Sequence, residues 1–273
     1  MSEENPPVTT LPEALPDCDL KGMGVLVTRP EGQAGPLCDL IAARGGRPEP
    51  FPAIEIRGPL DPRPLQALLD RLGGFHMAIF ISPNAVRYGL ALLGERRWPP
   101  RLKIAAVGRG TALALEKAGL KAGIVPKERF DSEALLAAPE LNDVAGRRIV
   151  IFRGNGGRPL LGDTLRQRGA EVAYAEVYRR LRPAADVEPL LRRWRSDIQV
   201  VTVTSGDILD NLAAVLGARG LKYLRETPLL VISERMRAQA GKLGCIRIIL
   251  AQGADNVAVL RALCAWAASE TRL

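Results

Sequence analysis

The chain has 273 residues, of which 47% are hydrophobic and 25% charged, and this composition excludes a wholly disordered or fibrous protein. Its length favours one large α/β domain or two lobes. The formal net charge of +8 suits an anionic partner; aromatic residues make up only 4%, which disfavours nucleic acid, whereas a polyanionic small molecule fits the same charge.

Residues 1–20 are rich in Pro and Glu and have no periodicity, so they are predicted to be a flexible tail. They lack the basic head and apolar core of a secretory signal, and no apolar stretch approaches the roughly 20 residues that cross a bilayer. We therefore expect a cytoplasmic protein without a membrane span. The four cysteines show no CxxC spacing and the chain has a single His, so we expect reduced thiols and no metal site.

From Lys21 onward, short apolar strands alternate with helical patterns of ten or more residues. This alternation predicts parallel sheets covered by helices. The predicted strands are GVLVT (24–28), MAIFIS (77–82), KIAAVG (103–108), RRIVIFRG (147–154), IQVVTVTS (198–205) and PLLVIS (228–233).

An internal repeat supports two similar lobes. Three pairs of strand-end landmarks recur at offsets of 124, 123 and 125 residues, and a shared spacing carries more weight than any single pair. The pairs are Arg29 with Arg153, Ser82 with Ser205, and Gly108 with Ser233.

Polar residues follow several of these strands, at the edge where parallel sheets bind ligands. Four of them have two interpretations: the side chain caps the next helix, or it contacts an anionic ligand. Capping is favoured for each of the four taken alone, namely Ser82, Asn84, Ser205 and Thr111. The RGNGGR segment at 153–158 fits an ordinary turn or an anion site equally well. The candidates are Thr28, Arg29, Ser82, Asn84, Thr111, Arg153, Asn155, Ser205 and Ser233.

Conventional catalytic and nucleotide motifs are not visible. RGNGGR is neither a Walker loop nor a correctly spaced GxGxxG. His76 has no Ser or Asp partner and is predicted to be structural. Glu49 and Glu55 are expected to flank a strand. Tyr174 and Tyr178, four apart in a strand-like segment, are expected on one face of it.

Several segments together resemble one family. These are VLVTRPEGQ from 25, FISPNAV from 80, AAVGRGTALALEKAGL from 105, IVIFRGNGG from 149 and VTSGDILDNL from 203, with FDSEALL at 130–136 and V-Y-R at 177–179. In this order they resemble the uroporphyrinogen-III synthase family from about Lys21 to the C-terminus. The resemblance implies an enzyme of tetrapyrrole (heme) biosynthesis that uses no metal or organic cofactor. It takes linear hydroxymethylbilane, inverts the terminal ring D and closes the macrocycle with loss of water.

The resemblance also implies an architecture of two flavodoxin-like α/β lobes joined by a two-stranded connector, with the first lobe discontinuous. Here lobe 1 would be 21–48 plus 182–273, the connector strands 49–57 and 171–181, and lobe 2 would be 58–170. The substrate carries an acetate and a propionate on each pyrrole, which suits the basic chain. We expect a monomer.

By the same resemblance, Tyr178 matches the family's functional tyrosine, suspected of assisting departure of the hydroxyl, and Thr111 matches a threonine of the ligand cleft. One departure concerns the second repeat of the chain, where the family often has a Gly-Pro-x-Thr-like turn. This chain has Ser233-Glu234-Arg235-Met236, so Ser233 is the nearest substitute for the missing hydroxyl.

Two alternatives stay open at this level. A non-catalytic bilobal protein that closes on an anionic ligand fits the same pattern, although an export signal is not visible. A nucleotide-sugar transferase with paired α/β lobes would need a nucleotide-binding loop that the sequence does not show.

Overall fold

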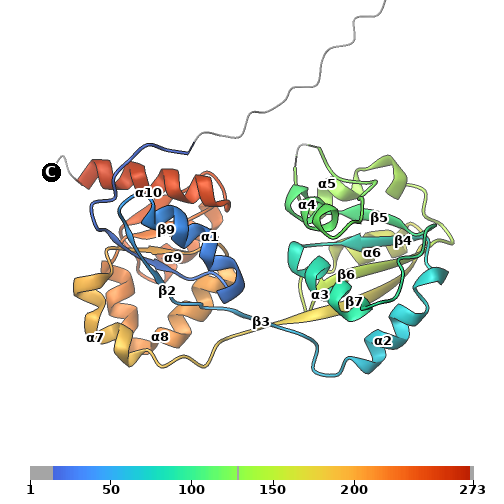
Figure 1. Ribbon diagram of the computed structural model, residues 1–273, viewed down its shortest axis with the longest axis horizontal. Coiled ribbons are helices and arrows are strands. Elements are labelled where there is room, and N and C mark those ends of the chain that lie inside the picture. Colours follow the sequence, from blue (N-terminus) through green and yellow to red (C-terminus); the bar gives the residue numbers. More distant parts are fainter. Residues whose placement is uncertain (1–14, 128, 271–273) are drawn as a thin grey trace, which may run out of the picture. The chain divides into compact units, whose positions relative to one another are not determined.

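The computed structural model describes residues 15–127 and 129–270, so residues 1–14 of the predicted tail lie outside the described residues. The chain divides into two compact units (Figure 1). Unit 1 combines the residues up to Glu55 with those from Leu181 onward, and unit 2 spans Ile56–Arg180. The predicted fold class is confirmed: two parallel-sheet α/β units, of which the first is discontinuous.

Unit 1 is built on a five-stranded parallel sheet in the order β10-β9-β8-β1-β2. Helices α1 and α10 pack together over the sheet, while α8 packs with α7 and α9. The strands are β1 (Gly24–Val27), β2 (Arg47–Pro50), β8 (Val200–Thr202), β9 (Leu229–Val231) and β10 (Ile248–Leu250), and the helices are α1 (Glu31–Ala42), α7 (Glu188–Asp197), α8 (Gly206–Glu226), α9 (Glu234–Lys242) and α10 (Asn256–Glu270).

A disulfide links the segment before β1 to α10, the last helix of unit 1. Cys18 forms a disulfide with Cys264 of α10, and Leu20 is buried and donates its backbone N–H to the carbonyl of Arg44. The expectation of four reduced thiols is therefore wrong for this pair, whereas Cys38 and Cys245 are free. A pairing across 246 residues leaves no spacing signal that the sequence could have shown.

Unit 2 has a second five-stranded sheet, in the order β3-β7-β6-β4-β5, in which β4 to β7 pair in parallel. The strands are β3 (Glu55–Arg57), β4 (Met77–Phe80), β5 (Lys103–Ala106), β6 (Arg148–Gly154) and β7 (Glu171–Leu181). The helices are α2 (Arg63–Asp70), α3 (Pro83–Leu93), α4 (Arg109–Lys117), α5 (Ser132–Leu136) and α6 (Leu160–Gln167), with short 3-10 turns at Leu72–Gly74 and Pro139–Leu141.

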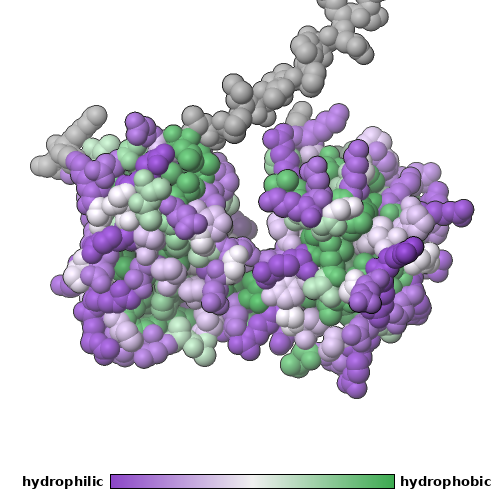
Figure 2. All heavy atoms as spheres, in the orientation of Figure 1, coloured by the Kyte–Doolittle hydropathy of each residue, from purple (hydrophilic) through white to green (hydrophobic). Residues whose placement is uncertain are grey.

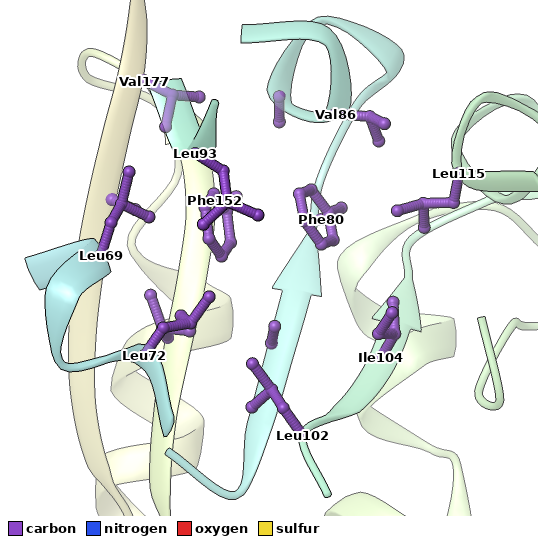
Figure 3. Close-up of a cluster of buried hydrophobic side chains, with 14 of the residues drawn as sticks. Leu69, Leu72, Phe80, Val86, Leu93, Leu102, Ile104, Leu115, Phe152 and Val177 are labelled. Carbon is purple, nitrogen blue, oxygen red and sulfur yellow. The ribbon is translucent and has the colours of Figure 1, made fainter. Parts of the chain in front are cut away.

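The two faces of this sheet bury separate apolar clusters. On one face Phe80 and Phe152 stack with ring centroids 4.4 Å apart beneath Leu93 of α3, as Figure 3 shows. On the other face Ile79 and Ile151 pack with α5 and α6. Strands buried on both faces are apolar throughout, which is why MAIFIS and RRIVIFRG are recognisable in the sequence. Each fully buried Phe contributes roughly 1.5–3 kcal/mol to folding.

β7 contains an irregularity that changes which way its tyrosines point. Arg153 of β6 faces Glu176, but the next residue of β6 faces Tyr178, so Val177 is an extra residue in β7. Such a bulge breaks the alternation of side chains along a strand. Tyr174 consequently packs with the α5/α6 cluster and Tyr178 with the Phe80/Phe152 cluster. The expectation that both tyrosines share one face is wrong.

The segment 171–181, expected as a connector strand, is thus for most of its length a member of the unit 2 sheet. Most large apolar side chains are buried. The face drawn in Figure 2 carries many hydrophilic residues together with apolar areas on both units. Among the helices of residues 15–127 and 129–270, none has the length and apolar character needed to cross a bilayer.

Candidate active site at the strand ends

Three of the predicted serines cap helices that follow parallel strands. Ser82 accepts from the N–H of Ala85 at 3.1 Å, Ser205 from Ile208 at 3.2 Å and Ser233 from Met236 at 3.3 Å. The predicted capping role is confirmed for Ser82 and Ser205, and Ser233 caps its helix in the same way. Capping was also predicted for Asn84, but the N-cap of α3 is Ser82. These caps place the N-termini of α3, α8 and α9 at the carboxyl edges of their sheets, where backbone N–H groups and the helix dipole favour anions.

Thr111 does not cap α4. The helix begins at Arg109 after Gly108, which makes no side-chain cap, and Thr111 is its third residue, with only 4% of its surface exposed. The capping interpretation is therefore wrong for this residue. A Cβ on Gly108 would lie 2.9 Å from the Cβ of Phe130, so the close approach of that loop leaves no room for a capping side chain there.

Thr28 and Arg29 follow β1 and are both held by neighbouring backbone. The buried Thr28 hydroxyl donates to the carbonyl of Thr202 at 2.6 Å and so joins the ends of β1 and β8. Arg29 donates to the side chain of Asn256 and to the carbonyl of Ala254 at 2.7 Å. Burial lowers the pKa of the Arg29 guanidinium, while nearby Asp255 acts in the opposite direction. A cation is thereby fixed in place at the carboxyl edge of unit 1.

Tyr178 is the centre of a polar cluster at the carboxyl edge of unit 2. Its side chain is fully buried, and its phenol oxygen lies 3.1 Å from the Ser82 hydroxyl and 3.3 Å from Nη2 of Arg180. The Tyr88 ring lies 5.9 Å away on the apolar side. Arg180 is exposed, and its guanidinium donates to the buried phenol oxygen. The phenol oxygen is therefore held by two polar side chains, those of Ser82 and Arg180.

Gly154 makes room for this ring. A Cβ at Gly154 would lie 2.5 Å from Cε2 of Tyr178, which no ordinary side chain tolerates. The backbone N–H of Asn155 donates to the Tyr178 carbonyl at 2.9 Å, and the Asn155 side chain accepts from the N–H of Arg180 at 2.8 Å. The turn after β6 thus fixes the strand on both sides of Tyr178.

Arg153 belongs to the opposite face of the sheet. It is 7% exposed, its guanidinium stacks 4.8 Å from the centroid of the Tyr174 ring, and it donates to the carbonyl of Gly154 at 3.2 Å. The next two glycines of the RGNGGR turn, Gly156 and Gly157, adopt φ of 66° and 91°, which side chains rarely tolerate. Of the named candidates in this turn, Asn155 is the exposed one.

The structure brings Ser82, Tyr178 and Asn155 together in unit 2 and gathers Thr28, Arg29, Ser205 and Ser233 at the strand ends of unit 1. Asn84 lies in the first turn of α3, close to the Ser82 cap. Sequence reasoning missed Arg180 and Tyr88. The sequence signal for Arg180 was its position two residues after Tyr178. Tyr88 had no such signal, because it lies in α3, far from Tyr178 in the sequence.

The remaining predictions concern residues outside this cluster. His76 accepts from the backbone N–H of Arg148 at 3.0 Å, so its structural role is confirmed. Glu49 lies in β2 and pairs with Arg193 at 2.6 Å, as expected for a residue that flanks a strand. In the part of the chain that the structure describes, His, Cys, Asp and Glu form no group of three that could hold a metal ion.

Comparison with known sequences identifies relatives over most of the chain. The family model described as Uroporphyrinogen-III synthase HemD matches residues 36–260. The uroporphyrinogen-III synthase of Escherichia coli K12 is 38% identical over 245 residues, which cover 88% of this chain and all of the relative. That of Salmonella typhimurium LT2 is 39% identical over 248 residues, with the same coverage of both chains.

Solved structures with the same fold include two bacterial enzymes. A mutant uroporphyrinogen III synthase of Thermus thermophilus matches with a TM-score of 0.63 and 17% identity, covering 91% of this chain and 99% of its own. The uroporphyrinogen-III synthetase of Helicobacter pylori 26695 matches with a TM-score of 0.56 and 15% identity, with the same coverage. At these identities the likeness concerns the fold.

Proposed function

The chain belongs to the uroporphyrinogen-III synthase family and is an enzyme that cyclises hydroxymethylbilane, and on this premise we propose that Tyr178 assists departure of the substrate's terminal hydroxyl. The observation that carries the proposal is the phenol held between the Ser82 hydroxyl and the Arg180 guanidinium at the carboxyl edge of the unit 2 sheet.

The proposed reaction requires only one proton donor from the protein, which later recovers its proton. The hydroxyl leaves as water with a proton from the phenol, and the pyrrole electrons stabilise the resulting azafulvene cation. Attack through the substituted carbon of ring D gives a spiro intermediate, which fragments and recloses to the inverted macrocycle. The proton lost when the last ring regains aromaticity restores the phenol, so the step balances. Orienting the chain for attack by the correct carbon supplies the rest of the acceleration.

Arg180 has two tasks in this proposal. Its guanidinium donates to the phenol oxygen, so it stabilises the negative charge that develops there when the proton leaves. It also covers the buried phenol from an exposed position. A substrate carboxylate can pair with the remaining N–H groups of this guanidinium while Nη2 keeps its hydrogen bond to the phenol oxygen.

Substrate binding is assigned to the strand ends of each unit by itself. We propose that carboxylates of the bilane accept hydrogen bonds from backbone N–H groups at the N-termini of α3, α8 and α9. Exposed or half-buried side chains add to these contacts: Arg29, Asn84, Asn155, Ser205 and Ser233. Thr28, Thr111 and Arg153 are more deeply buried, and we propose that they support the same strand ends.

We further propose that the enzyme acts as a cytoplasmic monomer without nucleic acid. The excess positive charge would then serve the eight carboxylates of the tetrapyrrole substrate. Sedimentation of the purified chain checks the oligomeric state: a single species of about 29.5 kDa is expected, and a stable dimer at assay concentration would exclude it.

Adjacent arginines allow a matched test of the site. Arg180→Gln removes the donor to the Tyr178 phenol, whereas Arg179→Gln removes a guanidinium that donates instead to the carbonyl of Gly58 at 3.1 Å. Enzymatically generated hydroxymethylbilane is supplied, and the oxidised porphyrins are separated by isomer. We expect formation of the type III isomer to slow about tenfold or more in Arg180→Gln and to stay within about twofold of the parent in Arg179→Gln. Equal rates in both variants would exclude the proposed role of Arg180.

A further inference from the structure

A cavity of about 720 Å³ lies at the amino edge of the unit 1 sheet, opposite the edge that carries the serine caps. Its lining includes residues that immediately precede strands: Met23 before β1, Gln199 before β8 and Pro228 before β9. None of the residues assigned to substrate binding or to the reaction lines it. The cavity is therefore separate from the proposed active site.

Aromatic side chains contribute to its wall: Tyr223 and Trp266 are half-buried, whereas Trp194 has only 1% of its surface exposed. Trp194 and Tyr223 stack with centroids 6.2 Å apart and an interplanar angle of 19°, and Trp266 adds a third ring. The guanidinium of Arg195 lies 5.4 Å from the Tyr223 centroid, and that of Arg247 lies 5.1 Å from the Trp266 centroid. A guanidinium stacked on a ring keeps its in-plane N–H groups for an anion, so ring and cation together suit a flat, charged ligand.

The charge of the lining is positive. Four cationic side chains (Lys21, Arg47, Arg195 and Arg247) face two carboxylates. The carboxylates pair with two of the arginines: Glu226 with Arg195 at 3.4 Å and Glu270 with Arg247 at 2.7 Å. Partly exposed ion pairs of this kind are worth about 0–1 kcal/mol, so an incoming anion can replace the carboxylate at small cost.

The fold alone does not account for these cations. Arg195 lies in the last turn of α7, where a positive charge complements the helix dipole. Arg47 and Arg247, however, stand at the beginnings of β2 and β10, where no helix end requires them, and Arg47 also donates through Nε to the carbonyl of Gly22 at 2.9 Å. A volume of about 720 Å³ falls within the range of small-molecule sites. We propose that this cavity binds a planar aromatic anion, a ring system bearing a carboxylate, phosphate or sulfonate, at a site distinct from the cyclisation site.

The three tryptophans allow the site to be located directly. Two of them, Trp194 and Trp266, line the cavity, whereas Trp98 belongs to unit 2. The probe is 2-naphthalenesulfonate, added to the full-length ¹⁵N-labelled chain while the indole N–H signals are followed by NMR. We expect the chemical shifts of the Trp194 and Trp266 indole N–H groups to change with probe concentration along one saturable curve. The chemical shift of the Trp98 indole should not change. The neutral 2-naphthalenesulfonamide should bind at least fivefold more weakly. Unmoved Trp194 and Trp266 signals, or equal binding of the two probes, would overturn the proposal.

Two variants, one that removes a positive charge and one that removes a negative charge from the cavity lining, test whether charge determines binding. Arg247→Gln removes a stacked cation and should weaken sulfonate binding at least fivefold, whereas Glu270→Gln removes the competing carboxylate and should tighten it severalfold. Arg101→Gln is the matched control, because Arg101 is an exposed cation of unit 2, and it should leave the affinity for the sulfonate unchanged. Turnover of hydroxymethylbilane should be unchanged in all three. The proposal would be contradicted if Arg247→Gln and Glu270→Gln changed the affinity for the sulfonate in the same direction or left it unchanged. If a variant fails to fold, the NMR titration of the wild-type chain still tests the proposal.

Discussion

Replacing Tyr178 with Phe removes one oxygen atom from the centre of the proposed site. The ring stays in the apolar cluster with Phe80 and Phe152, so packing is retained. The substitution abolishes the hydrogen bonds of the phenol oxygen to Ser82 at 3.1 Å and to Arg180 at 3.3 Å. Both partners keep other interactions, because Ser82 still caps α3 and the exposed Arg180 meets water. The loss of stability should therefore be about 1 kcal/mol, the typical effect of one hydrogen bond.

The effect on turnover should be larger than the effect on stability. Loss of a positioned proton donor commonly costs about 10²–10⁴ in rate. Because the azafulvene forms in free solution, we expect an effect at or below the lower end of this range, a decrease of about ten- to a hundredfold in the rate of type III product. The assay is the separation of porphyrin isomers after oxidation, with thermal unfolding measured on the same samples.

Tyr174→Phe is the matched control for this experiment. Tyr174 lies on the other face of the sheet, where its ring contacts Arg153 and Arg166 and its phenol oxygen lies 3.4 Å from Nη1 of Arg166. It should lose a similar small amount of stability without the loss of rate. The reasoning is refuted if the two variants turn over equally, because backbone donors and substrate conformation would then suffice as the mechanism.

Three further changes probe the same structure. Gly154→Ala places a methyl group against the Tyr178 ring, so it should destabilise the chain by about 1–3 kcal/mol and lower turnover; full activity would show that the ring does not need its present position. Ser233→Ala removes the cap of α9 and should cost about 1 kcal/mol in thermal unfolding, and an unchanged melting curve would speak against that cap. Alkylation of the denatured chain should modify two thiols before reduction and four afterwards, whereas four from the outset would rule out the disulfide between Cys18 and Cys264.

The strand ends could be predicted because their signals are local. An apolar run that ends in Ser is a strand followed by a capped helix, and Ser82, Ser205 and Ser233 all follow this pattern. The apolar run of β10 is not followed by such a serine, and this strand was not predicted from the sequence.

The centre of the site could be predicted only in part, because its geometry depends on pairing between strands. Alternation along β7 places Tyr174 and Tyr178 on one face, and only the extra residue Val177, visible in the register with β6, separates them. Arg180 contacts the phenol just beyond this bulge, whereas Arg153 is buried on the opposite face beside Tyr174. A bulge has no sequence signature here, so the family resemblance identified Tyr178 while the packing around it came from the structure.

The central claim is that this chain directs the cyclisation of hydroxymethylbilane with inversion of ring D. The most direct measurement supplies the purified protein, without added cofactor, with freshly generated hydroxymethylbilane and determines the ratio of type III to type I porphyrin after oxidation. Spontaneous closure gives the type I isomer. The account predicts that type III predominates and that its share rises with protein concentration; a product that stays type I at every protein concentration would contradict it.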